Sequence, residues 1–144
     1  MYKKILIPVD GSENATLACS HAIALAKSGN MEVVLLSCYE MQSARVGAGG
    51  SAIAASLEGQ CKGTLASCES LCAENGLKYK CLIKCGNPSK CIIEAAEEED
   101  CDLIVIGSRG LGSIVGTVMG SVTSQVLRDS SIPVLVVRKK KQRK

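Results

Sequence analysis

The stretch DLIVIGSRGLGSIVGTVMGSVT, residues 102–123, joins an apolar run of strand length to five of the chain's 14 glycines. Such a run predicts a strand buried on both faces, as in a parallel sheet covered by helices. A helical pattern begins at Gly120. Strand, glycine-rich loop and helix in this order can present backbone N–H groups at a helix N-terminus, where phosphate binds favourably. The stretch therefore predicts an α/β protein with an anion-binding loop.

Four further segments have the composition of strands, and helical patterns separate them. The strand segments are KKILIPV (3–9), EVVLLSC (32–38), LKYKCLIKC (77–85) and IPVLVV (132–137), and the helical patterns cover residues 12–29, about 52–75, 87–100 and 120–129. Strands that alternate with helices predict right-handed βαβ crossovers. We therefore expect one domain, residues 1–138, built on a doubly wound, five-stranded parallel sheet.

Sequence signals also predict the ends of the helices. Ser12 and Asn87 are typical N-caps, Pro88 suits a first helical position, and Gly29 suits a helix end. The apolar face of the first helix is expected to include Leu25. The glycine-containing stretch 41–56 predicts a mobile loop. Such a loop is expected to be either a lid or partner surface, or an insertion without a role.

The charge pattern places the basic character of the chain in a C-terminal tail. The net charge is +3, but residues 138–144, RKKKQRK, carry +6 and leave −3 for residues 1–137. The tail, 139–144, has no interleaved aromatic residues for base stacking, so nucleic acid is not the expected partner. No apolar run approaches the roughly 20 residues of a membrane span. We expect a cytoplasmic protein without a membrane partner.

The nine cysteines contain no C-x-x-C pair, and most lie in apolar-patterned segments. They are expected to be reduced core thiols, since cysteine is often buried. A structural zinc site is the alternative, with Cys68 and Cys72 one helical turn apart and Cys61 on the same face. The single histidine, His21, lies on another predicted helix and is expected to be exposed.

The glycine spacing in residues 107–121 matches neither common phosphate-binding motif. Ser113 stands where a Walker A loop needs lysine, and Val115 stands where a dinucleotide fingerprint needs its third glycine. The pattern present is G-x-x-G, nine residues, then G-S, which comprises Gly107, Gly110, Gly120 and Ser121.

This pattern, together with KKILIPVDGSENA (3–15), LIVIGSRGLG (103–112) and GSVTSQVLRDSSIPVLVV (120–137), resembles the ATP-binding members of the universal stress protein (UspA-like) family. The resemblance covers nearly the whole chain. It implies a three-layer, Rossmann-like fold of the adenine nucleotide alpha hydrolase type with strand order 3-2-1-4-5. It also implies ATP, or AMP or ADP, as the ligand, together with Mg²⁺ or Mn²⁺.

The resemblance transfers a set of nucleotide-binding positions to this chain. They are Pro8, Val9, Asp10, Cys38, Gly107, Ser108, Arg109, Gly110, Gly120, Ser121, Val122 and Thr123. The glycines are expected to adopt positive φ and to let backbone N–H groups approach the ligand closely. The hydroxyls of Ser121 and Thr123 are expected to donate hydrogen bonds to phosphate. Asp10 is expected near the ribose and the metal-bound phosphates, or alternatively as a helix cap ahead of Ser12.

No Ser-His-Asp arrangement or Walker lysine is evident in the sequence, so we expect an ATP-binding regulatory module that acts on an unidentified protein partner. Slow metal-dependent hydrolysis of ATP is one alternative, and a structural stress-response dimer with an empty site is another. In the strand order that the resemblance implies, the last strand is an apolar edge, which favours a homodimer through Val134, Leu135, Val136 and Val137.

Overall fold

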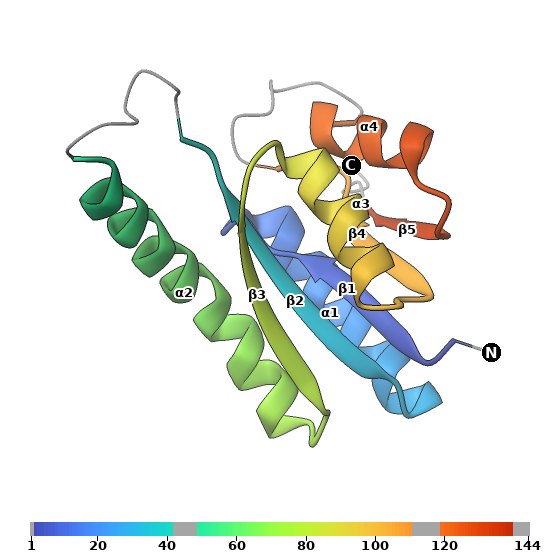
Figure 1. Cartoon of the computed structure of the whole chain (residues 1–144). Helices are drawn as coiled ribbons and strands as arrows, with labels where there is room; N and C mark the ends of the chain where they lie inside the picture. The colour runs from blue at the N-terminus through green and yellow to red at the C-terminus, as the bar shows by residue number, and fades with distance from the viewer. Residues whose placement is uncertain (1, 42–48, 111–118, 140–144) are drawn as a thin grey trace, which may run out of the picture.

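A single five-stranded parallel sheet organises this computed structural model, which describes residues 2–41, 49–110 and 119–139. The elements in chain order are β1 (Lys4–Pro8), α1 (Glu13–Gly29), β2 (Glu32–Tyr39), α2 (Gly50–Glu74), β3 (Tyr79–Cys85), α3 (Pro88–Glu98), β4 (Leu103–Gly107), α4 (Ser121–Asp129) and β5 (Val134–Val137). The strand order is β3-β2-β1-β4-β5 and each neighbouring pair is parallel, which confirms the expected doubly wound α/β fold (Figure 1).

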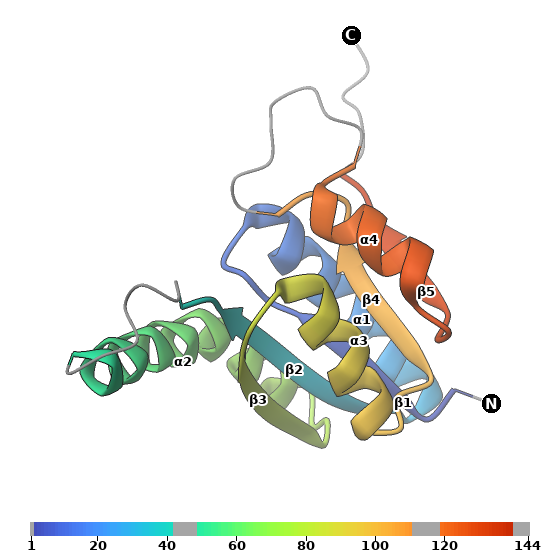
Figure 2. The ribbon, with the colours of Figure 1, turned by 45° about the horizontal axis from the view of Figure 1, so that its top comes forward.

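Two hydrophobic cores sandwich the sheet, because successive side chains of a strand point to opposite faces. Ile5 and Ile7 pack with α1 and α2 on one face, while Leu6 packs with α3 and α4 on the other. Figure 2 shows α3 and α4 on the same face of the sheet, and α2 extending outward past β2 and β3. No helix of the described residues is long and apolar enough to cross a membrane.

The predicted N-caps of α1 and α3 are confirmed. The Ser12 hydroxyl accepts from the backbone N–H of Ala15 at 3.1 Å, and the Asn87 side chain accepts from the N–H of Lys90 at 3.2 Å. The predicted end of α1 at Gly29 is also confirmed. Gly29 remains helical and Asn30 takes the left-handed conformation, with φ 53°.

Two expectations were wrong. Residues 50–56 belong to α2 rather than to a loop, since alanines within GSAIAAS favour a helix despite the glycines that precede them. The remainder of the expected loop, residues 42–48, lies outside the described residues. Leu25 is 40% exposed rather than on the buried face of α1, because that face follows the neighbouring positions Ala22, Ile23 and Ala26.

Candidate functional site

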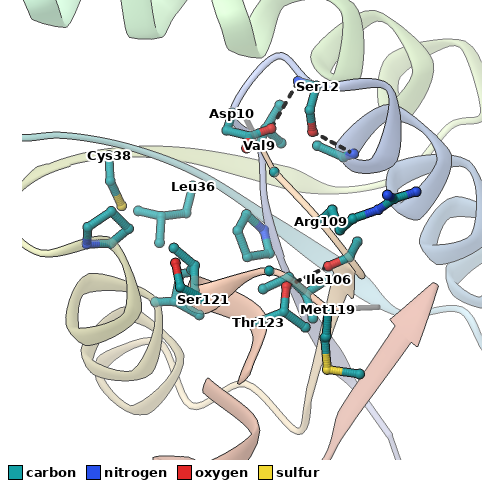
Figure 3. Close-up of a pocket in the computed structure, with 18 residues that line it drawn as sticks. Val9, Asp10, Ser12, Leu36, Cys38, Ile106, Arg109, Met119, Ser121 and Thr123 are labelled. Carbon is teal, nitrogen blue, oxygen red and sulfur yellow. Dashed lines mark hydrogen bonds between the residues drawn. The ribbon is translucent and has the colours of Figure 1, made fainter. Parts of the chain in front are cut away.

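A cleft of about 560 Å³ opens at the carboxyl ends of β1 and β4, where the strand order reverses. Connections leave the sheet in opposite directions at such a point, which makes it the usual ligand site of doubly wound sheets. In Figure 3, Asp10 and Ser12 lie on one side of the cleft and Ser121 and Thr123 on the other. All the residues expected from sequence line this cleft, except Ser108.

Ser108 has a structural position instead. It is only 4% exposed. Its N–H donates to the carbonyl of Val137 at 3.0 Å, and its carbonyl accepts from the N–H of Gly120 at 2.7 Å. Ser108 therefore ties the end of β4 to β5 and to the start of α4.

The N-terminus of α4 opens into the cleft. Gly120 is the N-cap, in an extended conformation with φ −72° and ψ 160°, and it provides no side-chain cap. The N-termini of α1 and α3 are capped by Ser12 and Asn87, so α4 differs from them. First-turn N–H groups without a capping side chain, at the positive end of the helix dipole, favour an anionic ligand.

Thr123 fixes this helix to the sheet. Its hydroxyl, in a residue 3% exposed, donates to the carbonyl oxygen of Gly107 at 2.7 Å. The hydroxyl proton that we expected to be donated to a ligand is therefore used within the protein. Ser121 has an exposed side chain at the cleft, and its hydroxyl is the better-placed donor of the two.

The glycines at positions 107 and 110 have a steric explanation rather than the expected positive φ. A Cβ on Gly107 would lie 2.8 Å from the backbone carbon and oxygen of Asn14, at the start of α1. A Cβ on Gly110 would collide with the carboxylate of Asp10. Neither residue, nor Gly120, has a positive φ. The glycines therefore allow β1, α1 and the loop after β4 to approach one another closely.

Asp10 lies at the edge of the cleft, and its side chain organises the turn into α1. The Oδ1 atom accepts from the N–H of Ser12 at 2.9 Å, and the intervening Gly11 has a φ of +86° that favours glycine. Ser12, not Asp10, is the N-cap. Asp10 thus stabilises this turn and also presents a carboxylate to the cleft.

One end of the cleft is apolar. Cys38 lies at this end with Leu36 in Figure 3, and Val9, Pro88, Ile92 and Ile106 add further apolar lining to the cleft. Of these residues, only Val9 and Cys38 were expected from sequence. Ser12, Ala15 and Met119 were missed as well. The missed residues follow the general pattern of buried strands and helices, and only the three-dimensional fold identifies which of them reach the cleft.

Arg109 is half-buried, and its side chain in Figure 3 runs away from Ser121 and Cys38. This side chain lines the cleft without pointing to its centre. Among the described residues, no group of three His, Cys, Asp or Glu side chains is arranged to hold a metal ion. Cys61, Cys68 and Cys72 therefore do not form the alternative zinc site, and His21 is exposed on α1.

Comparison with known proteins gives one consistent result. A model described as the universal stress protein family matches residues 1–138. Universal stress protein MJ0531 of Methanocaldococcus jannaschii is 36% identical over 146 residues, covering 99% of this chain and 85% of that protein. The structure of MJ0577 from the same organism superimposes with a TM-score of 0.90 at 34% identity, covering 99% of both chains. A universal stress protein in complex with cAMP has a TM-score of 0.69 at 26% identity, covering 95% of this chain and 97% of its own.

Proposed function

Because this chain belongs to the universal stress protein family, we propose that it is a regulatory module that binds ATP, or AMP or ADP, in the cleft. The observation that carries the proposal is the N-terminus of α4, which opens into the cleft without a capping side chain. The cleft also lies at the strand-order reversal, where nucleotides bind in such folds. A solved relative that holds cAMP supports an adenine nucleotide as the class of ligand.

The two ends of the cleft suit the two ends of a nucleotide. The phosphates would lie against the first-turn N–H groups of α4 and the hydroxyl of Ser121. The base would lie in the apolar end, between Val9, Cys38 and Ile92. Asp10, across the cleft from Ser121 in Figure 3, would be near the ribose.

A divalent cation fits this site only together with the phosphates. Asp10 is the one carboxylate among the described residues that line the cleft. Mg²⁺ is commonly held by one or two carboxylates, substrate phosphates and water. Asp10 would therefore contact Mg²⁺ or Mn²⁺ directly or through water, and the ion would offset the repulsion between carboxylate and phosphate.

We propose binding, rather than turnover, as the principal activity. The described cleft-lining residues include no histidine or lysine, so Asp10 and Arg109 are their only charged side chains. Slow hydrolysis that depends on Asp10 and the metal remains the alternative. The readout of the nucleotide would then be a change in the surface offered to a protein partner.

We further propose a homodimer through β5. This strand pairs only with β4 and lies at the edge of the sheet in the described part of the chain. Its Leu135 is 39% exposed, and its Val134 and Val136 are half-buried. An apolar edge strand favours pairing with another chain, and a two-fold dimer would satisfy it.

The proposed function is tested by identifying what copurifies with the protein. The purified chain is denatured, and the released small molecules are identified by mass spectrometry. An adenine nucleotide in near-stoichiometric amount supports the proposal. If none is released, ATP with Mg²⁺ must raise the melting temperature of the protein, because a ligand that binds only the folded state stabilises it. No release and no thermal shift would together refute the proposal.

A further inference from the structure

A thiol that lines the cleft has a second, buried thiol close to it. Cys38, near the end of β2, is half-buried and lines the cleft. Cys91, in the first turn of α3, is 4% exposed and does not line the cleft. Its sulfur lies beside Gly86, whose N–H donates to the carbonyl of Tyr39, the neighbour of Cys38, and the two thiols interact. Cys38 is the one described cysteine that lines the cleft.

The fold brings these thiols together by ordinary local rules. Val34, Leu36 and Cys38 alternate along β2 and face the core beneath α3, where Ile92 also lies. The cap at Asn87 starts α3 so that Cys91 falls within its first turn. A Cβ on Gly86 would lie 3.2 Å from the Cys91 sulfur, so the glycine leaves room for that sulfur.

We propose that Cys38 and Cys91 form a redox-active dithiol. Hydroperoxides that enter the cleft oxidise it to a disulfide, and a nucleotide bound in the cleft protects it from this oxidation. The Cys38 sulfur, as thiolate, attacks one oxygen of the peroxide, and the O–O bond breaks. The attacked oxygen remains on sulfur as sulfenic acid, and the other oxygen takes a proton and leaves as water or alcohol. The Cys91 sulfur then displaces the hydroxyl, which departs as water, and the S–S bond forms. Two electrons and two protons pass from the dithiol to the peroxide.

Access distinguishes this pair from the other thiol pair in contact. The Cys19 thiol on α1 and the Cys68 thiol on α2 also interact, but these residues are 0% and 1% exposed and do not line the cleft. Cys85 on β3 is exposed, but its register partner on β2 is Tyr39, the residue after Cys38. Because successive side chains of a strand point to opposite faces, Cys85 and Cys38 are on opposite faces of the sheet. Cys38 therefore combines a neighbouring thiol with access from the cleft.

Burial makes the reaction slow. It raises the pKa of Cys38 to about 12 and raises the pKa of Cys91. The charged and titratable groups around the pair are Lys84 on β3, Glu94 on α3, Cys61 on α2 and Cys85 on β3. Because the thiolate is the nucleophile, the dithiol resists brief exposure and is oxidised during sustained exposure to peroxide.

The shielding step rests on the proposed function, whereas disulfide formation does not. A nucleotide base in the apolar end of the cleft would cover Cys38, the half-buried member of the pair. It would thereby block the path to both sulfurs. The two steps are accordingly tested in separate arms.

The first arm uses the full chain, freed of nucleotide and treated with hydrogen peroxide. Remaining thiols are alkylated, and peptides are mapped by mass spectrometry without reduction. We expect a Cys38–Cys91 disulfide as the main product, unchanged in Cys85→Ser. In Cys91→Ser, dimedone should trap sulfenic acid at Cys38. Because Cys91 is buried, Cys38→Ser provides a second variant, in which no disulfide to Cys91 should form. Full alkylation of both Cys38 and Cys91 after prolonged oxidation would overturn the proposal.

The second arm repeats the oxidation with saturating ATP and Mg²⁺. We expect the disulfide to form at least about fivefold more slowly in the wild-type protein, while alkylation of exposed Cys85 is unchanged. An unchanged rate in protein shown by calorimetry to bind ATP would overturn the shielding step. If calorimetry shows no binding of ATP, the proposed function fails, and the disulfide found in the first arm still establishes the dithiol.

Discussion

The hydroxyl of Thr123 donates a hydrogen bond to the carbonyl oxygen of Gly107 at 2.7 Å, and this bond joins the first turn of α4 to the end of β4. It positions the N-terminus of α4 against the strand-order reversal. Ser108 reinforces the junction, since its carbonyl accepts from the N–H of Gly120. The position of the candidate phosphate site therefore depends on hydrogen bonds within the protein as well as on the groups that would bind phosphate.

Replacing Thr123 with valine tests this junction. The substitution keeps the side-chain shape but leaves the Gly107 carbonyl without its side-chain donor. We expect a loss of about 1–3 kcal/mol in the free energy of unfolding, measured by urea denaturation. Thr123→Ser retains the hydroxyl and should recover most of that loss. Equal stability of Thr123→Val and wild type would show that the bond does not hold α4 in place.

Replacing Gly107 with alanine tests the close approach of α1. The new Cβ would meet the backbone of Asn14 at 2.8 Å, so the first turn of α1 would have to move. We expect a loss of about 1–3 kcal/mol in unfolding free energy, as for overpacking. Gly59→Ala is the control, because nothing lies within 4 Å of its Cβ position. It should stabilise α2 by up to about 1 kcal/mol. A neutral Gly107→Ala variant would contradict the steric explanation.

Alkaline pH should destabilise the folded chain through its buried thiols. Burial raises the pKa of Cys72 and Cys101 from 9.0 to about 11, and that of Cys81 to about 12. The folded state keeps these protons where the unfolded state has lost them, so stability is full below pH 9 and falls from pH 9 to 12. The urea midpoint should decrease between pH 8 and pH 11. Cys101→Ala should make this decrease smaller, and a midpoint independent of pH would contradict the prediction.

Leu135 provides the test of the proposed dimer. We expect light scattering to give about twice the chain mass for the wild-type protein at tens of micromolar. Leu135→Lys should shift the protein toward monomer, because it places a charge on the exposed edge of β5. Leu127→Lys is the matched control, since Leu127 is 41% exposed but lies on α4. Dissociation by both variants, or a monomeric wild type, would count against β5 as the interface.

The elements of the fold were predictable because periodicity and capping are local properties. The run LIVIG matches β4, and the caps at Ser12 and Asn87 depend on residues two or three positions away. Residues 52–56 fell both in the helical pattern and in the expected loop, and the glycines nearby favoured the loop, whereas α2 already begins at Gly50.

The candidate site was predictable only in part. The glycine spacing indicated which loops matter, but it did not reveal why the glycines are needed. Gly107 accommodates Asn14, 93 positions earlier in the chain, and the thiol of Cys38 on β2 interacts with that of Cys91 on α3. Such contacts depend on the packing of distant segments, which a local pattern does not encode.

Titration calorimetry with ATP and Mg²⁺ tests the central claim most directly. The wild-type protein should give a one-site isotherm in the micromolar range, about −8 kcal/mol. Gly120→Val should weaken binding at least about tenfold, because the side chain would cover the N-terminus of α4, while φ −72° and ψ 160° are acceptable for valine. Gly59→Val changes an exposed position of α2, and this variant should bind ATP with the affinity of the wild-type protein. Equal affinity of Gly120→Val and the wild type, with both folded, would contradict the account.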